Sequence, residues 1–348
     1  MNITAKDLMD LMDTWAPQDL AESWDHPGLQ VGDPNEPVKK VLIALDVTAE
    51  NVEYADAHGV NMIISHHPFL FKSIHTLDLT SWRGAIIGKL ITSRIVSFAA
   101  HTNLDTARGG VNDALAGALG LQDCKGFVPE KTRPMMKVAA YAPFVKAKEF
   151  HYRVKEAYPD MGKTFYLLGD FDDAARVGKM EFNVPSEKLP QLLDEMKSIC
   201  GPIHYDLYEL KNGGRHETMG RMGHLPHPMT GREALEHVKK CLGLPVLRYA
   251  GNPERTVDTV AVLGGAGSEF ASLAKAKGAD LYVTGDLKYH EAQDAAGMGL
   301  LIADAGHFYT ERVVVPALAG RIRKAAAEKG WDLEVVEDSG AKDIFGHV

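Results

Sequence analysis

The sequence of 348 residues predicts an α/β protein, a two-lobed and mostly parallel α/β core interrupted by a small ferredoxin-like α+β domain. Short apolar runs alternate with amphipathic segments in both outer parts of the chain, which is typical of βαβ units and a largely parallel sheet. This texture changes near residue 130 and returns near residue 216. We therefore divide the chain into a core lobe (1–128), an inserted domain (129–215) and a second core lobe (216–348).

In the first lobe, an amphipathic helix with Thr4 as its N-cap is followed by a turn-rich stretch over 24–32. Apolar runs that are short enough for strands then alternate with helical patterns. Strands are expected over 40–46, 60–65 and 95–100, and helices over 4–20, 49–58, 81–93 and from about residue 110.

The inserted domain has the order β-α-β-α-β, which suggests a ferredoxin-like fold. Its strands are expected over 137–143, 176–184 and 203–210, and its helices over 146–157 and 186–199, the second with Ser186 as its N-cap. Asn212-Gly213-Gly214 is predicted to be a linker. In the second lobe, helices are expected over 230–242, 267–277, 288–296 and 309–328, and strands over 256–263, 280–284, 299–304 and 332–337.

The charge balance excludes several function classes. Lys and Arg number 38 and Asp and Glu 47, which gives a net charge of −9 without any basic tract. Nucleic acid is therefore not expected as a partner, since binding phosphates requires clustered Lys and Arg.

No apolar run reaches the length of about 18 residues that a membrane-spanning helix needs. Three widely spaced cysteines and the lack of a secretory N-terminus favour a reducing cytoplasm over a disulfide framework.

The chain has 15 histidines, and several of them follow predicted strands directly. In parallel α/β sheets, ligands bind beyond the carboxyl ends of the strands. Polar groups at five such ends are Asp46; His66 and His67; His101 and Asp105; Asp286 and His290; and His307 and Glu311.

Each motif has a functional and a structural interpretation. His66 and His67 point to opposite sides of an extended segment, so the pair can serve two metal ions, whereas the alternative is a polar strand cap. His307 and Glu311 have the i, i+4 spacing of helical ligand pairs, and the alternative is an exposed hydrogen-bonded pair. Asp105 near imidazoles suits a divalent metal, but it can equally cap the next helix.

Together these residues predict a site for two divalent metal ions with open positions. Imidazole with carboxylate suits Zn, Mn, Fe or Ni. The expected ligands are His66, His67, Asp105, His307 and Glu311, and the surrounding or acid–base residues are His101, Asp286 and His290. Gly264-Gly265-Ala266-Gly267 follows a strand and resembles a phosphate-binding turn, but a plain tight turn is the favoured interpretation.

Several motifs resemble the GTP cyclohydrolase 1 type 2 family, also described as dinuclear-metal-centre hexameric proteins. The matching segments are 24–32 (WDHPGLQVG), 45–48 (LDVT), 65–68 (SHHP), 101–105 (HTNLD), 220–223 (GRMG), 284–290 (TGDLKYH), and Gly306-His307 with Glu311. The resemblance implies that the five ligands bind two metals, with Glu311 as the bridge. It also implies a toroidal homohexamer with the metal sites facing an internal cavity, and a middle domain similar to trimeric signalling proteins.

The leading functional hypothesis is a metal-dependent hydrolase acting on a small molecule such as a nucleotide. For a GTP cyclohydrolase, water would attack C8 of the guanine, the ring would open and formate would leave, with His101 or His290 carrying protons. This acidic chain offers no obvious Arg or Lys clamp for a triphosphate, and the nearest candidates are Lys288 and Arg312. A phosphoesterase is therefore kept as an alternative to a GTP cyclohydrolase. A second alternative is a non-catalytic, metal-binding or regulatory hexamer.

Overall fold

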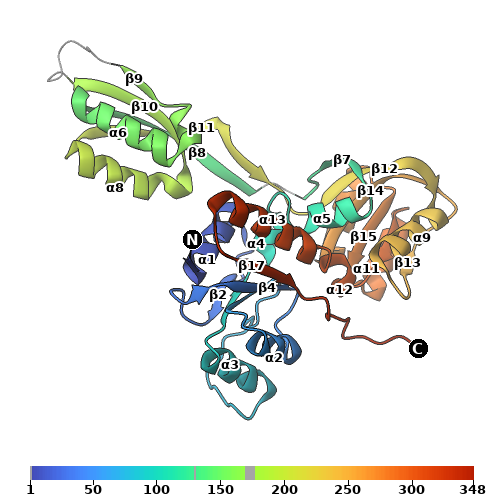
Figure 1. Cartoon of the computed structure of the whole chain (residues 1–348). Helices are drawn as coiled ribbons and strands as arrows, with labels where there is room; N and C mark the ends of the chain where they lie inside the picture. Colours follow the sequence, from blue (N-terminus) through green and yellow to red (C-terminus); the bar gives the residue numbers. More distant parts are fainter. Residues whose placement is uncertain (1, 129–130, 169–176) are drawn as a thin grey trace. The chain divides into compact units, whose positions relative to one another are not determined.

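The computed structural model describes residues 2–128, 131–168 and 177–348. Two compact units are present. The first unit joins both ends of the chain, Met1–Glu130 and Thr218–Val348, and the second unit is Lys131–Glu217. The fold is mixed α/β, and the first unit contains two sheets of five and six strands (Figure 1).

The five-stranded sheet of the first unit has the order β17-β4-β5-β6-β2. Its parallel strands are β4 (Lys40–Ala44), β5 (Met62–Ser65), β6 (Val96–Ala99) and β17 (Glu334–Glu337), and β2 (Gly28–Val31) is antiparallel to β6. The last strand of the chain therefore joins the sheet of the N-terminal segment. Burial on both faces explains why β4 and β5 are continuous apolar runs. A separate antiparallel pair is formed by β1 (Ile3–Thr4) and β3 (Pro37–Val38).

Helices cover both faces of this sheet. One core contains residues of α1 (Ala5–Trp15), α4 (Thr102–Thr106) and α13 (Val314–Lys329), and the other contains residues of α2 (Ala49–Ala57) and α3 (Trp82–Thr92). Asp7 accepts a hydrogen bond from Thr4 N at the start of α1. The helix ends at Trp15 and not at residue 20, because Pro17 cannot continue it; a 3₁₀ turn follows over Gln18–Leu20.

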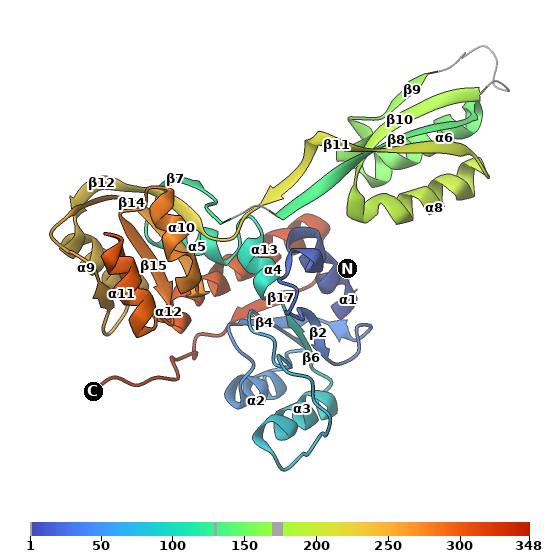
Figure 2. The ribbon, with the colours of Figure 1, turned by 180° about the vertical axis from the view of Figure 1, so that it is seen from behind.

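The six-stranded sheet has the order β13-β16-β15-β14-β12-β7. Its strands are β13 (Arg248–Ala250), β16 (Leu301–Asp304), β15 (Leu281–Gly285), β14 (Thr256–Ala266), β12 (Arg221–Thr230) and β7 (Gln122–Lys125). Strands β16, β15 and β14 are parallel to one another. The remaining pairings are antiparallel: β13 with β16, β12 with β14, and β7 with β12. Residues of α5 (Val111–Ala118) and α9 (Gly231–Leu242) pack in one core, and residues of α10 (Ala271–Ala276) and α11 (Tyr289–Gly297) in another (Figure 2). A 3₁₀ turn, η3 (Ser268–Phe270), precedes α10.

The helix expected over 309–328 is two helices, α12 (His307–Glu311) and α13. This break separates the short helix that carries His307 and Glu311 from the long helix that packs on the first sheet. Among the described residues, no helix is long and apolar enough to cross a membrane.

The second unit is an antiparallel sheet with the order β11-β8-β10-β9 and helices packed in one core. Its elements are β8 (Lys131–Pro143), α6 (Phe144–Ala157), α7 (Pro159–Gly162), β9 (Tyr166–Leu168), β10 (Val177–Pro185), η2 (Ser186–Lys188), α8 (Leu189–Cys200) and β11 (His204–Glu217). The prediction of a linker at Asn212-Gly213-Gly214 is wrong, because this segment lies inside β11 at a bulge between Leu210 and Gly214. Ser186 starts a 3₁₀ turn and does not cap α8.

Candidate metal centre

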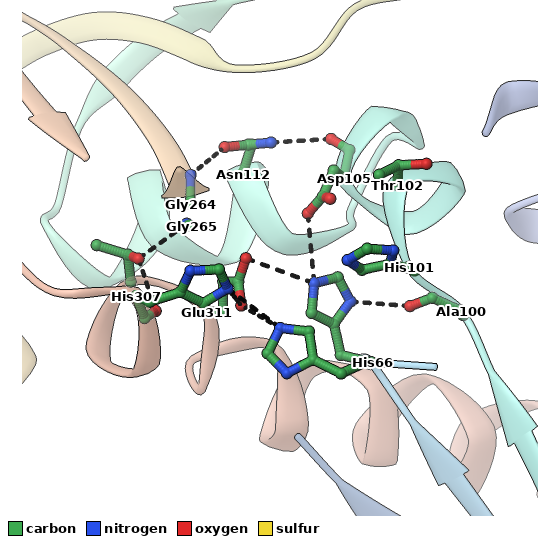
Figure 3. A network of polar contacts seen from close by, with 12 residues as sticks. His66, Ala100, His101, Thr102, Asp105, Asn112, Gly264, Gly265, His307 and Glu311 are labelled. Atoms are coloured by element: carbon green, nitrogen blue, oxygen red, sulfur yellow. Dashed lines mark hydrogen bonds and ion pairs between the residues drawn. The ribbon is translucent and has the colours of Figure 1, made fainter. Parts of the chain in front are cut away.

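The predicted ligands lie together where strands of the two sheets of the first unit end (Figure 3). His66 and His67 follow β5 directly, and Asp105 is on α4 just after β6. His307 and Glu311 are the first and last residues of α12, which follows β16. The short connections after buried strands therefore position all five side chains.

Potential ligand atoms form two groups that share Glu311. We name His66, Asp105 and Glu311 the inner group, and His67, His307 and Glu311 the outer group; within each group the ligand atoms lie within 4.8 Å of one another. His101, which the sequence predicted as a surrounding or acid–base residue, forms a third such group with His66 and His67.

The inner group has two buried polar atoms that lack a hydrogen-bond partner within the described part of the chain, His66 Nε2 and Asp105 Oδ1. They are 3.7 Å apart, and Glu311 Oε1 is also 3.7 Å from His66 Nε2. These distances are too long for hydrogen bonds. Two ligands with bonds of about 2.1 Å to one tetrahedral ion would lie about 3.4 Å apart. The inner donors thus fit a divalent cation better than they fit one another.

In the outer group, two imidazole nitrogens converge on one carboxylate oxygen. Glu311 Oε2 is 2.8 Å from His67 Nε2 and 3.0 Å from His307 Nε2. The two nitrogens are 3.2 Å apart. Because nitrogen and carboxylate oxygen ligands from three directions suit a divalent ion, this group also fits a metal.

The other ring nitrogen, Nδ1, of each clustered histidine lies against an oxygen. Asp46, Asp286 and Asp25 carboxylates lie 2.8, 2.8 and 2.9 Å from Nδ1 of His67, His307 and His101, respectively. His66 Nδ1 lies 2.8 Å from the Ala100 carbonyl. Such contacts fix ring orientation and leave Nε2 free to bind a metal. Asp286 was predicted as a surrounding or acid–base residue, and it contacts His307 Nδ1.

The role of Asp25 was missed in the sequence. Besides His101, its carboxylate accepts hydrogen bonds from Thr102 N and Thr102 Oγ1. Burial acts to raise the pKa of Asp25, but the hydrogen bonds from His101 and Thr102 outweigh it and lower the pKa to about 2. The signal in the sequence was the 24–32 motif, which carries the acid but not the identity of its partner.

The pKa values of the cluster reflect burial and close charges. Burial raises the pKa of Asp105 to about 7, and the Glu311 carboxylate acts in the same direction. Burial also acts to raise the pKa of Glu311, but the surrounding imidazoles hold it well below its usual value. Burial alone would lower the pKa of His67 and His307, but the neighbouring carboxylates raise these to about 10 and about 9. The site therefore holds concentrated charges of both signs.

The glycine-rich segment 264–267, expected to be a tight turn, lies at the end of strand β14 and does not form a phosphate cradle. Its N–H groups at Gly264, Gly265 and Gly267 donate to the side chains of Asn112, Thr310 and Thr284. A Cβ atom at Gly265 would lie 2.2 Å from Glu311 Oε1, and the φ of this residue is +66°. Glycine at this position therefore makes room for the shared carboxylate.

The remaining predicted residues lie outside the ligand groups. His290 is exposed at the start of α11, with its ring edge-on to Tyr289. Of the two predicted phosphate contacts, Lys288 is exposed with Nζ 3.7 Å from Glu291. Arg312 donates to the Leu242 carbonyl and packs over Phe308.

A cavity of about 1540 Å³ borders the outer group. Its wall includes His67 and His307 and their carboxylate partners Asp46 and Asp286. Arg248 is also in this wall, and its guanidinium pairs with Asp304. A small molecule in the cavity would therefore reach two of the candidate ligands.

Comparisons with known proteins agree with the resemblance. A GTP cyclohydrolase 1 type 2 homolog of Halalkalibacterium halodurans is 33% identical, with 97% of each chain covered. The Bacillus subtilis homolog is 31% identical, with 96% of each covered. A Bacillus cereus protein related to NIF3 has a similar structure, with TM-score 0.86, 33% identity and 99% of each chain covered. For Staphylococcus aureus protein SA1388 the TM-score is 0.83, with 30% identity and 99% coverage of each. Residues 3–343 match the family described as Duf34/NIF3 (NGG1p interacting factor 3), and the chain belongs to this family.

Proposed function

We propose that the protein is a metal-dependent hydrolase with a dinuclear site for divalent ions, one in the inner and one in the outer group. The observation that carries the proposal is a pair of buried atoms, His66 Nε2 and Asp105 Oδ1, that have no hydrogen-bond partner among the described residues. Leaving buried polar atoms unpaired is costly, so their persistence calls for a partner. A divalent cation supplies that partner, and Zn, Mn, Fe and Ni all suit the donors. Glu311, with one oxygen toward each group, is proposed as the bridge.

When bound, two such ions supply Lewis-acid activation of water and of a substrate oxygen. The chain's own residues orient the site. Asp46 and Asp286 hold the rings of His67 and His307 through Nδ1, so that both Nε2 atoms face Glu311. His101, held by Asp25, is proposed to carry a proton to or from the substrate. His290, exposed on α11, is proposed to exchange protons with solvent.

The names of the relatives support ring-opening hydrolysis of GTP or a related nucleotide as the reaction. In that reaction one water attacks C8 of the guanine and the C8–N9 bond breaks, which opens the ring to a formamide. A second water then cleaves the C8–N7 bond, and C8 leaves as formate. A phosphoesterase on the same site is the second candidate, because the cavity wall supplies few cations for a triphosphate: its Arg and Lys residues are Arg248, which already pairs with Asp304, and Lys342.

The proposal extends to the architecture. The second unit has the element order β-α-β-β-α-β and the strand order β11-β8-β10-β9, which support a ferredoxin-like domain inserted near residues 129–215 between two α/β lobes. A toroidal homohexamer is proposed from the family resemblance. Three free cysteines support a reducing cytoplasm.

Elemental analysis of the purified protein, together with its mass in solution, tests the proposal first. About two divalent metals per chain in a hexamer are expected. The variant His66→Ala with His307→Ala should lose bound metal and keep its circular dichroism, whereas His58→Ala with His224→Ala, two histidines outside the ligand groups, should keep both. Unchanged metal content in the first variant would contradict the site.

The reaction is tested on metal-loaded protein with GTP and simple phosphoesters. Release of formate supports the cyclohydrolase reaction, and release of inorganic phosphate alone supports the phosphoesterase. Bound metal with neither product from any nucleotide would favour the non-catalytic, regulatory alternative.

A further inference from the structure

We propose that Trp24 and Phe71 form a subsite that binds a planar, conjugated ring of the substrate next to the metal ligands. The inference rests on the proposed function, because it concerns the substrate of that site. It adds two residues that contact substrate and the chemical class of the group they contact.

The two aromatic side chains are exposed and adjoin the cluster. Trp24 is 55% exposed and Phe71 47%. Their ring centroids are 5.9 Å apart with the planes at 66°. His101 lies between them and the ligands: its ring is 6.0 Å from Trp24 and 6.1 Å from Phe71, both edge-on. The same imidazole is 5.3 Å from the ring of His66. One residue therefore separates the exposed pair from the inner group.

The backbone that carries the pair is held in place. Asp25, the neighbour of Trp24, is buried and bonded to His101 and Thr102. Leu70, the neighbour of Phe71, donates from its N–H to Gln30 Oε1, and Gln30 Nε2 donates to the carbonyl of His26, in the loop of Trp24. Gln30 thus joins the two loops. Anchored loops that present exposed rings form a preorganised surface, which lowers the ordering cost of binding.

The chemistry of the pair selects a flat ligand. Aromatic rings prefer offset stacking or edge-to-face contact with other π-systems, and such contact tolerates different bases. Exposed apolar surface is also stabilised when a ligand covers it. A ring stacked here would hold an attached reactive atom within reach of His101, the residue proposed to carry a proton. A substrate without a flat ring would leave both aromatic side chains in water.

Equilibrium dialysis on the metal-loaded full chain tests this with two probes, guanosine 5′-monophosphate and ribose 5-phosphate, which differ by the planar base. In the wild type the nucleotide should bind at least about tenfold more tightly, as expected for base stacking. Trp24→Ala and Phe71→Ala should each reduce this ratio towards one, and Trp24→Phe should keep most of it. Tyr152→Ala, which removes an exposed aromatic ring of the second unit, should leave the ratio unchanged.

The outcomes separate this inference from the proposed function. A wild-type ratio of one in protein with its full metal content would overturn the subsite and leave the metal hydrolase standing. A ratio unaffected by either alanine variant would also overturn it. If the alanine variants instead change the mass in solution at a constant ratio, the pair is a contact between copies of the chain and the inference is wrong. Should Trp24→Ala not fold, Phe71→Ala in its exposed loop decides.

Discussion

The inner and outer groups use the same kinds of ligand but differ in how they are held. Side-chain exposure is 0% for His66 and 11% for Asp105, against 23% for His67 and 39% for His307. The His66 ring is held by a backbone carbonyl, whereas the outer rings are held by the half-exposed carboxylates of Asp46 and Asp286.

This difference teaches which half of the site can be changed without disturbing the fold. Moving the Ala100 carbonyl would require moving β6, so the inner ring is fixed by the sheet. Each outer ring depends on one replaceable side chain. We therefore expect a tightly held inner ion and an outer ion whose affinity follows Asp46 and Asp286.

Replacing the residue shared by both groups should have the largest effect. Glu311→Gln removes the charge of the carboxylate that faces His66, His67 and His307. We therefore expect both metals to bind more than about 100-fold more weakly, which exceeds the loss usual for residues that only hydrogen-bond to a metal ligand. Metal titration monitored by calorimetry measures this. Glu328→Gln, the same change on the exposed face of α13, is the control and should have no effect. Loss of one ion only would show that Glu311 is not shared.

The next largest effect is expected from a methyl group at Gly265. A Cβ would lie 2.2 Å from Glu311 Oε1, so Gly265→Ala should displace the shared carboxylate and weaken both ions. The positive φ adds about 1–2 kcal/mol of destabilisation. Gly120→Ala isolates that backbone term, because Gly120 has a φ of +69° and nothing within 4 Å of the added atom. In metal-free protein, thermal unfolding should shift to lower temperature in both variants, and in metal titrations the loss of metal should be confined to Gly265→Ala. Equal metal binding in the two would contradict the cradle.

Much of this site was accessible from local sequence. His66, His67 and Asp105 follow apolar strands, and His307 and Glu311 have helical spacing, so strand ends and periodicity were enough to group them. The alternation of elements likewise predicted a mixed α/β fold. These signals are local because a buried parallel strand needs a continuous apolar run.

The parts that were not predicted depend on contacts between distant segments. Asp25 contacts His101, which is 76 positions away in the sequence. Gly265 is on strand β14 and lies against Glu311 on helix α12. Neither residue has a local pattern that names its partner. The pairing of β17 with β4 and of β7 with β12 is equally non-local, and the exposed strand β7 lacks an apolar run. The bulge in β11 made its glycines resemble a linker.

A smaller effect, limited to the outer group, is expected from Asp286→Ala. Removing the carboxylate that holds His307 Nδ1 should weaken the outer ion by about 10–100-fold and leave the inner ion unchanged. The chain offers a matched control in Asp258→Ala, which removes the carboxylate 2.9 Å from Nδ1 of His224, outside both groups. Calorimetric titration should resolve a strong and a weakened site in the first variant only. Equal weakening of both ions would mean that the groups are not independent.

The smallest expected difference concerns how fast the unmodified protein loses its metals. A chelator such as EDTA reaches a ligand through solvent, and His307 is partly exposed beside the cavity, whereas His66 is fully buried. Removal should therefore have two phases, the faster one belonging to the outer ion. Stopped samples analysed for metal at successive times measure the phases, and in Asp286→Ala the fast phase should become faster while the slow phase keeps its rate. The two ligand groups have the same types of ligand atom and share Glu311, so burial is the main difference between them. A single phase in both proteins would therefore show that burial does not distinguish the two groups.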